Sequence, residues 1–240
     1  MKVKNYNFVI IVSVVIILLG FTSKPTIENE IDTIFSEFNS KTPGASVLVT
    51  IGDSIAFSKC YGLSNIDKKT LIEQSTNFRL ASITKQFTAY SIMLLENEGK
   101  LSFEDKLIKY FPNFPSYGKD ITIRQILQHT SGLLAYEDYI DDSVSTQLKD
   151  KDVLKILLDR DSTYFKPGTK HRYSNSGYAL LALIIEKISQ KTYAQFLSER
   201  IFTPLKMSKS IAFEKRVSEV KNRAFGYAKT DSGFVFSDQS

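Results

Sequence analysis

The stretch RLASITKQFTA, residues 79–89, decides how the rest of the chain is interpreted, because the sequence changes character at Ser82. From this serine onward, apolar residues recur every three or four positions, a spacing typical of an amphipathic helix. Gly99 follows the last of them, and glycine commonly ends a helix. The sequence therefore predicts a helix that begins at Ser82 and ends at Gly99. Its apolar stripe consists of Ile83, Phe87, Tyr90 and Leu94.

Ser82 and Lys85 lie three positions apart, so on a helix the lysine amine can approach the serine hydroxyl. The start of a helix also offers free N–H groups and a positive dipole, which stabilise negative charge on oxygen. A serine in this position can act as a nucleophile with the lysine as its base. A plainer interpretation is that Ser82 caps the helix and Lys85 is solvated. The pair alone favours that plainer interpretation.

The Ser-x-x-Lys pattern occurs three times, so its surroundings must separate the copies. Ser116 and Lys119 lie in a loop rich in proline and glycine, which would not hold them in a helical relation. Ser218 and Lys221 lie in a charged segment that we interpret as an exposed helix. Only Ser82 stands at the start of an amphipathic helix, so this serine is the candidate nucleophile.

Tyr173-Ser174-Asn175 is the one Tyr-x-Asn sequence of the chain. In extended backbone the first and third residues point to the same side, so Tyr173 and Asn175 could both face a cleft. A phenol beside a cationic lysine has a lowered pKa and can relay a proton. The asparagine amide offers a donor and an acceptor to a substrate amide. The alternative is a tyrosine at a strand end followed by an asparagine in a turn.

The remaining pattern alternates strand-like, helical and again strand-like segments. The acidic residues Glu137, Asp138, Asp141 and Asp142 predict a solvated loop. The other predicted elements are a helix over 26–39, a β-hairpin over 45–61 that turns at Gly52-Asp53, a helix over 123–129 capped by Thr122, helices over 176–188 and 193–201, and a strand, turn and strand over 223–240.

The start of the chain resembles an export signal. Lys2 and Lys4 precede an apolar run over residues 8–19, and small residues follow it. We interpret residues 1–23 as a signal peptide, or alternatively as an uncleaved membrane anchor through residues 8–21. The protein is then exported, to the periplasm or the extracellular space, and residues 24–240 form its folded domain. The net charge of +5 is too small and too scattered to predict nucleic-acid binding.

Several kinds of site are not supported by the sequence. Cys60 is the single cysteine, so neither an intrachain disulfide nor a thiolate metal cluster is predicted. His129 and His171, the only histidines, are too few for a zinc site, and no Gly-x-Ser-x-Gly elbow or phosphate-binding glycine pattern occurs. We therefore expect no metal and no cofactor.

Three motifs together resemble a known family. Residues 79–89, LQHTSGL at 127–133 and FKPGTKHRYSNSGYALL at 165–181 occur in the order and spacing of the class C-like branch of the serine β-lactamase and penicillin-binding protein superfamily. That branch includes D,D-peptidases and esterases, and the resemblance covers roughly residues 28–240. It implies an α/β (α+β) fold, β-lactamase/transpeptidase-like, with an antiparallel sheet flanked by helices and a helical lobe.

The resemblance also implies roles for four residues. Ser82 resembles the serine that accepts the acyl group, with Lys85 as its partner. Tyr173 resembles the tyrosine that moves the proton, and Asn175 the amide that holds the substrate. The turn over 129–132 resembles a scaffold element without chemistry. The implied substrates are β-lactams, D-alanyl peptides of the cell wall or small esters.

One element of the family pattern is missing. Neither Lys-Thr-Gly nor His-x-Gly, which wall the family's site and supply an oxyanion-hole N–H, occurs here. Lys229-Thr230 is followed by Asp231 and is interpreted as part of a hairpin. We therefore expect a domain truncated at its C-terminus that lacks the later strands of the sheet. The alternative to a hydrolase is a non-catalytic binding or sensing module, or an inactive fragment.

Overall fold

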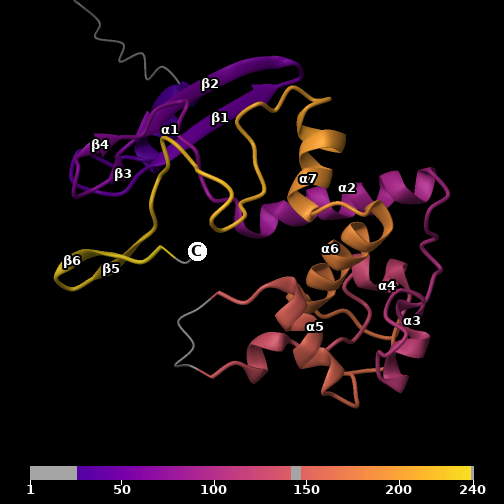
Figure 1. The fold of residues 1–240 in the computed structure, drawn as a ribbon. Helices are drawn as coiled ribbons and strands as arrows, with labels where there is room; N and C mark the ends of the chain where they lie inside the picture. The colour runs from indigo at the N-terminus through magenta and orange to yellow at the C-terminus, as the bar shows by residue number, and fades with distance from the viewer. Residues whose placement is uncertain (1–25, 142–146, 239–240) are drawn as a thin grey trace, which may run out of the picture.

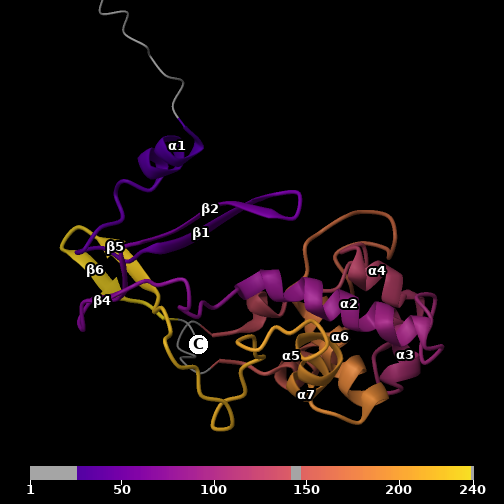
Figure 2. The same cartoon turned by 90° about the horizontal axis from the view of Figure 1, so that it is seen from above.

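The computed structural model describes residues 26–141 and 147–238, and these form two lobes (Figures 1 and 2). One lobe holds the β-hairpins and α1, and the other holds helices α2 to α7. The predicted signal peptide or anchor over residues 1–23 lies outside the described residues. Within the described ranges, no helix is both long enough and apolar enough to cross a membrane.

The strands of the described residues pair as three two-stranded antiparallel sheets. The first is the predicted hairpin, which turns at Gly52 with a φ of 57° and is confirmed. The last is also confirmed, because residues 227–236 form a strand, a turn and a strand. The pairs are β1 (Ala45–Ile51) with β2 (Ser54–Tyr61), β3 (Leu63–Asn65) with β4 (Thr70–Leu71), and β5 (Tyr227–Thr230) with β6 (Gly233–Phe236).

Helix α1 (Ile27–Ile34) is shorter than the helix predicted over 26–39. Thr26 caps its start by accepting a hydrogen bond from the backbone N–H of Asn29. At the other end, the Asn39 side chain accepts from the N–H of Lys41 and donates to the carbonyl of Glu37. Nearer the end of α1, the Ser36 hydroxyl donates to the carbonyl of Thr33. Such local side-chain hydrogen bonds compete with helical ones and favour a turn over residues 36–41.

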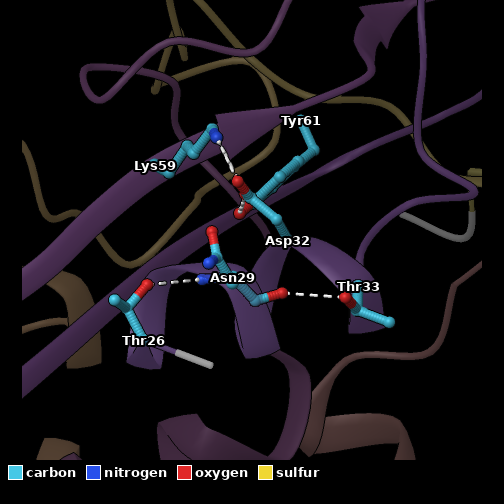
Figure 3. A network of polar contacts seen from close by, with 6 residues as sticks. All are labelled: Thr26, Asn29, Asp32, Thr33, Lys59 and Tyr61. Carbon is cyan, nitrogen blue, oxygen red and sulfur yellow. Dashed lines mark hydrogen bonds and ion pairs between the residues drawn. The ribbon is translucent and has the colours of Figure 1, made fainter. Parts of the chain in front are cut away.

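Asp32 fastens α1 to the first hairpin (Figure 3). Its carboxylate accepts hydrogen bonds from Lys59 Nζ at 2.7 and 2.8 Å and from the Tyr61 hydroxyl at 2.6 Å. These hydrogen bonds, first from Lys59 and then from Tyr61, lower the pKa of Asp32. Burial, and after it the bonded carboxylate, raise the pKa of Tyr61 to about 12. The network therefore favours an ionised Asp32 and a neutral Tyr61 at neutral pH.

The helical lobe contains the main hydrophobic core, and α6 (Asn175–Ser189) runs through its centre. Every residue from Ala179 to Ile185 on this helix is buried. Helix α6 packs against α2, α4, α5 and α7. The bounds of the other helices are α2 (Thr84–Asn97), α3 (Leu107–Tyr110), α4 (Ile123–Leu127), α5 (Asp150–Leu158) and α7 (Tyr193–Leu197).

The predicted helices around this core are largely confirmed, but the predicted apolar stripe of α2 was wrong. Its buried residues are Thr88, Ser91, Ile92 and Leu95, whereas Ile83 and Tyr90 are exposed. Thr122 caps α4 with a reciprocal pair of hydrogen bonds to Gln125, and Gly99 follows the end of α2 with a φ of 68°. Helix α6 begins one residue earlier than predicted, because the Ser174 hydroxyl caps it by accepting from the N–H of Gly177. Helix α7 continues as a π-helical turn over Ser198–Phe202.

Two other local predictions were wrong. The segment around Ser218 is not helical, because Arg216 has a φ of 72° and the Ser218 hydroxyl accepts a hydrogen bond from the N–H of Glu214. The segment Ser116–Asp120 is a 3₁₀ helix rather than a loop, closed by a hydrogen bond from the N–H of Gly118 to the carbonyl of Pro115. A proline can open such a turn, since its fixed φ suits it.

The turn over residues 129–132 pairs with the segment that leads to Tyr173. Its carbonyls accept hydrogen bonds from the N–H groups of Tyr164, Gly168 and Arg172. Gly132 has a φ of 73°, and a Cβ there would lie 2.3 Å from the carbonyl oxygen of Phe165. The glycine is therefore required both by the backbone conformation and by the close approach of the two segments.

We expect Gly132→Ala to destabilise the fold more than Gly99→Ala. Both glycines have left-handed φ values, of 73° and 68°, but a Cβ at Gly99 meets nothing within 4 Å. The left-handed conformation is unfavourable for alanine at either position. The backbone clash should lower the free energy of unfolding of the Gly132 variant by about 1–3 kcal/mol more, measured by urea denaturation. Equal losses in the two variants would contradict the close approach.

Candidate active site

Ser82 lies in a 3₁₀ turn, Ala81–Ile83, that runs directly into α2. The prediction that the helix begins at Ser82 is corrected in this detail, since α2 itself begins at Thr84. Ala81 has a φ of 45°, an unfavourable left-handed conformation for a residue with a Cβ. Lys85 occupies the first turn of α2 and its Nζ lies 3.0 Å from Ser82 Oγ. The serine and lysine thus have the predicted mutual approach.

Tyr173 and Asn175 reach the same place from the start of α6. The Tyr173 hydroxyl donates to Ser82 Oγ at 2.8 Å, and Lys85 Nζ donates to Asn175 Oδ1 at 2.8 Å. Ser174 between them is extended, with φ −135° and ψ 111°, and its own side chain is buried. The structure therefore brings all four residues named from the sequence into one hydrogen-bonded chain.

Glu137 completes this chain and was missed by sequence reasoning. Its Oε1 accepts a hydrogen bond from Asn175 Nδ2 at 2.6 Å. Glu137 and Asp138 lie on a 3₁₀ helix (Tyr136–Tyr139), and Asp138 accepts a hydrogen bond from the Tyr164 hydroxyl. Both residues are exposed, as a solvated loop predicts, but they lie on a short 3₁₀ helix and each accepts a hydrogen bond from another segment. No local signal identifies the contact, since it joins residues 38 positions apart in the sequence.

The charges around Tyr173 shift its acidity. Partial burial alone would raise the pKa of its phenol. The nearby Lys85 ammonium and the hydrogen bond with Ser82 outweigh burial and lower the pKa of Tyr173 below its ordinary value. Lys85 Nζ lies 4.8 Å from the centre of the Tyr173 ring, within the range of a cation–π interaction. A phenol held this way can give up and take back a proton.

The other Ser-x-x-Lys pairs are not assembled in this manner. In the described part of the chain, no hydrogen bond joins Ser116 to Lys119 or Ser218 to Lys221. Lys229 and Thr230 belong to β5, in the other lobe, and the Thr230 hydroxyl donates to the carbonyl of Gly233 across the hairpin turn. The hairpin interpretation of Lys229-Thr230-Asp231 is confirmed.

The site offers a hydroxyl, an amine, a phenol and an amide, and no set of metal ligands. Over residues 26–141 and 147–238, no group of three or more His, Cys, Asp or Glu side chains could hold a metal ion. An amine and a phenol within 3.0 Å of a serine hydroxyl can accept its proton while the oxygen attacks a carbonyl. The arrangement is therefore chemically suited to acyl transfer.

Comparison with known proteins agrees with this geometry. The Beta-lactamase family profile matches residues 31–239. Penicillin-binding protein 4* of Bacillus subtilis (strain 168) is 35% identical over 203 residues, which cover 82% of this chain and 45% of that protein. Protein flp of Staphylococcus aureus (strain MW2) is 32% identical over 216 residues, covering 88% of this chain and 43% of that protein. The chain belongs to the beta-lactamase family.

A solved structure confirms the fold. The octameric penicillin-binding protein homologue from Pyrococcus abyssi superposes with a TM-score of 0.75 at 30% identity, over 88% of this chain and 49% of that one. The predicted β-lactamase/transpeptidase-like fold, with helices and small antiparallel sheets, is confirmed. The chain spans about half the length of the curated relatives it matches, 45% and 43%.

The pKa of Tyr173 should respond in opposite directions to two substitutions. Lys85→Met removes the ammonium that lowers the pKa of Tyr173, so that pKa should rise. Glu137→Gln removes a negative charge that raises it, so the pKa should fall. Tyrosine labelled with ¹³C at Cζ, titrated by NMR and assigned with Tyr173→Phe, measures both shifts. Lys119→Met makes the same change in a Ser-x-x-Lys pair whose serine and lysine are not hydrogen-bonded, and it should leave the pKa of Tyr173 unchanged. Shifts of the same sign in both variants would contradict this electrostatic account.

Proposed function

We propose that this protein is a serine hydrolase that is acylated on Ser82. One observation carries the proposal: Ser82 Oγ lies within 3.0 Å of an amine and 2.8 Å of a phenol. Membership of the beta-lactamase family supports it, since acylation of a serine is the chemistry that the sequence resemblance implies. Residues 24–240 are the acylating domain in this proposal, and residues 1–23 direct export or anchor the chain outside the cytoplasm.

The proposed reaction has two halves. As Ser82 Oγ attacks the carbonyl carbon, its proton passes to Lys85 or Tyr173, and the carbonyl electrons move onto oxygen. The tetrahedral intermediate collapses, the bond to the leaving group breaks, and that group takes up the proton. In the second half a water molecule attacks the acyl carbon, the serine ester bond breaks, and Ser82 regains its hydrogen.

The lowered pKa of Tyr173 supports its part in the proton transfer. A phenol that ionises more easily than usual spends more time as the phenolate, which can accept the serine proton. Lys85 Nζ forms hydrogen bonds with both Ser82 and Asn175. Once the Lys85 ammonium has lost one proton, the neutral amine can accept the Ser82 proton and later give it back. The two groups thus share the role of base in the attack and of acid when the leaving group departs.

Asn175 is the proposed contact for the substrate. Lys85 holds its Oδ1 and Glu137 holds one of its two amide N–H groups, so the amide has a fixed orientation. The second N–H can then bind a carbonyl of the substrate. A β-lactam with an amide side chain and a D-alanyl peptide each carry such a carbonyl beside the reacting one, whereas a small ester can react at Ser82 without this contact.

A second candidate function is acyl acceptance without turnover. It concerns residues 1–240 taken by themselves, which contain neither Lys-Thr-Gly nor His-x-Gly and span about half the length of the matched relatives. Loss of one oxyanion-hole donor lowers a rate by about 10²–10³. A site that acylates slowly and deacylates more slowly would bind or sense a β-lactam rather than destroy it.

Incubation with a fluorescent penicillin followed by intact-mass measurement tests the proposal. We expect one covalent adduct on the wild-type chain and none on Ser82→Ala. Lys85→Ala and Tyr173→Phe should slow adduct formation by about 10²–10⁴, the usual contribution of general acid–base catalysis. Ser116→Ala and Ser218→Ala are matched controls, because each alters a Ser-x-x-Lys serine that is not bonded to its lysine, and both should label normally.

The lifetime of the adduct separates the two candidate functions. Adduct that disappears with release of hydrolysed penicillin supports the hydrolase, and adduct that persists for hours supports acceptance without turnover. An adduct formed equally by Ser82→Ala would refute the assignment of the nucleophile. If penicillin leaves the wild type unmodified, p-nitrophenyl acetate tests the ester class, and failure with both probes refutes an acylating function.

A further inference from the structure

His129 bonds to both chain neighbours of Tyr173. Its backbone carbonyl accepts a hydrogen bond from the N–H of Arg172 at 2.9 Å. Its ring Nδ1 accepts another from the N–H of Ser174 at 3.1 Å. His129 has a φ of 59°, in the left-handed region that few residues other than glycine adopt and in which histidine, asparagine and aspartate are the most frequent of those few. A single residue thus fixes the segment on either side of the tyrosine that contacts Ser82.

The imidazole of His129 also packs on the Tyr173 ring itself. The two ring centres lie 4.6 Å apart with an angle of 34° between their planes. The Tyr178 ring contacts the same imidazole, with the centres 5.1 Å apart. Lys85 Nζ lies 4.8 Å from the centre of the Tyr173 ring and 5.6 Å from that of Tyr178. His129 therefore packs against the same two aromatic rings that Lys85 contacts.

These contacts require one protonation state of the ring. A nitrogen that accepts a hydrogen bond from an N–H group carries no proton, so the neutral ring has its proton on Nε2. Protonation of Nδ1 would place two N–H groups face to face and remove the hydrogen bond. It would also add a second positive charge beside Lys85. The bonded arrangement is therefore available only to neutral His129.

Four titratable side chains face the His129 ring or lie beside it. Lys85 approaches from α2, His171 from the segment before α6, and Tyr173 and Tyr178 from the start of α6. Burial first, and then the charges of His171 and Lys85, lower the pKa of His129. Glu137, whose negative charge acts on Tyr173, is bonded to Asn175 instead. The site thus keeps His129 neutral at neutral pH and lets it protonate in acid.

We propose that His129 is a positioning residue of the acylation site: its neutral ring holds Tyr173 against Ser82, and protonation of the ring releases that hold. The inference rests on the proposed acylation of Ser82 and adds an acid-sensitive support to it. His129 touches neither Ser82 nor the reacting carbonyl. Its effect passes through the backbone at Ser174 and through the Tyr173 ring.

The hydrogen bond by which His129 holds the segment around Tyr173 can be tested without any substrate. In ¹⁵N NMR spectra of the whole chain, His129 should be neutral and protonated on Nε2 at pH 7. As pH falls, the amide signal of Ser174 should move along the protonation curve of His129, because the two atoms share a hydrogen bond. A ring protonated on Nδ1 at pH 7, or a Ser174 amide that ignores the titration, would overturn the proposal.

To test the effect on acylation, we need a His129 variant that keeps a hydrogen-bond acceptor for the Ser174 N–H and has no titratable ring. His129→Asn meets this need, since asparagine tolerates a left-handed φ and its Oδ1 can replace Nδ1 as acceptor. Adduct formation with the fluorescent penicillin is followed from pH 8 down to the pH at which the NMR titration shows His129 protonated. The ratio of the wild-type rate to the variant rate should fall about fivefold at the acid end, the rate equivalent of one hydrogen bond of about 1 kcal/mol.

His171→Asn is the matched control. It makes the same substitution in the neighbouring imidazole, 5.9 Å from the His129 ring, and leaves the acceptor of Ser174 in place. Because this variant keeps the His129 ring, it should still lose adduct formation in acid, and the loss should begin at a higher pH, since the charge of His171 that lowers the pKa of His129 is gone. A constant ratio of the wild-type rate to the His129→Asn rate would overturn the proposal. If the wild type forms no adduct with penicillin or the ester, acylation has failed, and the NMR result still decides whether His129 holds Tyr173.

Discussion

Leu180, Leu181 and Ile184 are fully buried in the middle of α6, where this helix packs against α2 and the other helices of its lobe. Burial of three such side chains contributes several kcal/mol, on the order of 1.5–3 kcal/mol for each. Their packing fixes the start of α6 relative to the start of α2. Tyr173 and Asn175 lie at the start of α6, and Ser82 and Lys85 lie at the start of α2. Apolar packing far from any reacting atom thus sets the distances among the polar groups.

The polar groups at these two helix starts form a continuous chain of hydrogen bonds. It runs from Tyr173 through Ser82, Lys85 and Asn175 to Glu137. The positive charge of Lys85 in the middle of this chain is balanced by the Glu137 carboxylate at its end. Each side chain is oriented by a hydrogen bond with its neighbour. In the proposed acylation, such preorganisation would lower the cost of bringing Ser82 and its base together, because their geometry exists before a substrate arrives.

Much of the fold could be predicted from the sequence, because the elements with strong local signals formed where expected. The hairpin at Gly52 and the cap at Thr122 depend on residues close in the chain. The same is true of the approach of Lys85 to Ser82, which follows from helical spacing. The parts of the site that could not be predicted are long-range contacts. Glu137 reaches Asn175, and His129 reaches Ser174, across 38 and 45 positions that carry no local pattern.

The side chains that contact Ser82, and those that support its partners, all come from helices and turns of one lobe (Figure 1). Among the described residues, the β1–β2 hairpin contributes no atom to the hydrogen-bonded chain, although Leu48, Ile51 and Ile55 leave much of its apolar surface exposed. Among the described residues, the hydrogen-bonded side chains and the exposed strand surface therefore lie on different elements. Substitutions on the exposed face of this hairpin should leave each hydrogen bond from Tyr173 to Glu137 in place.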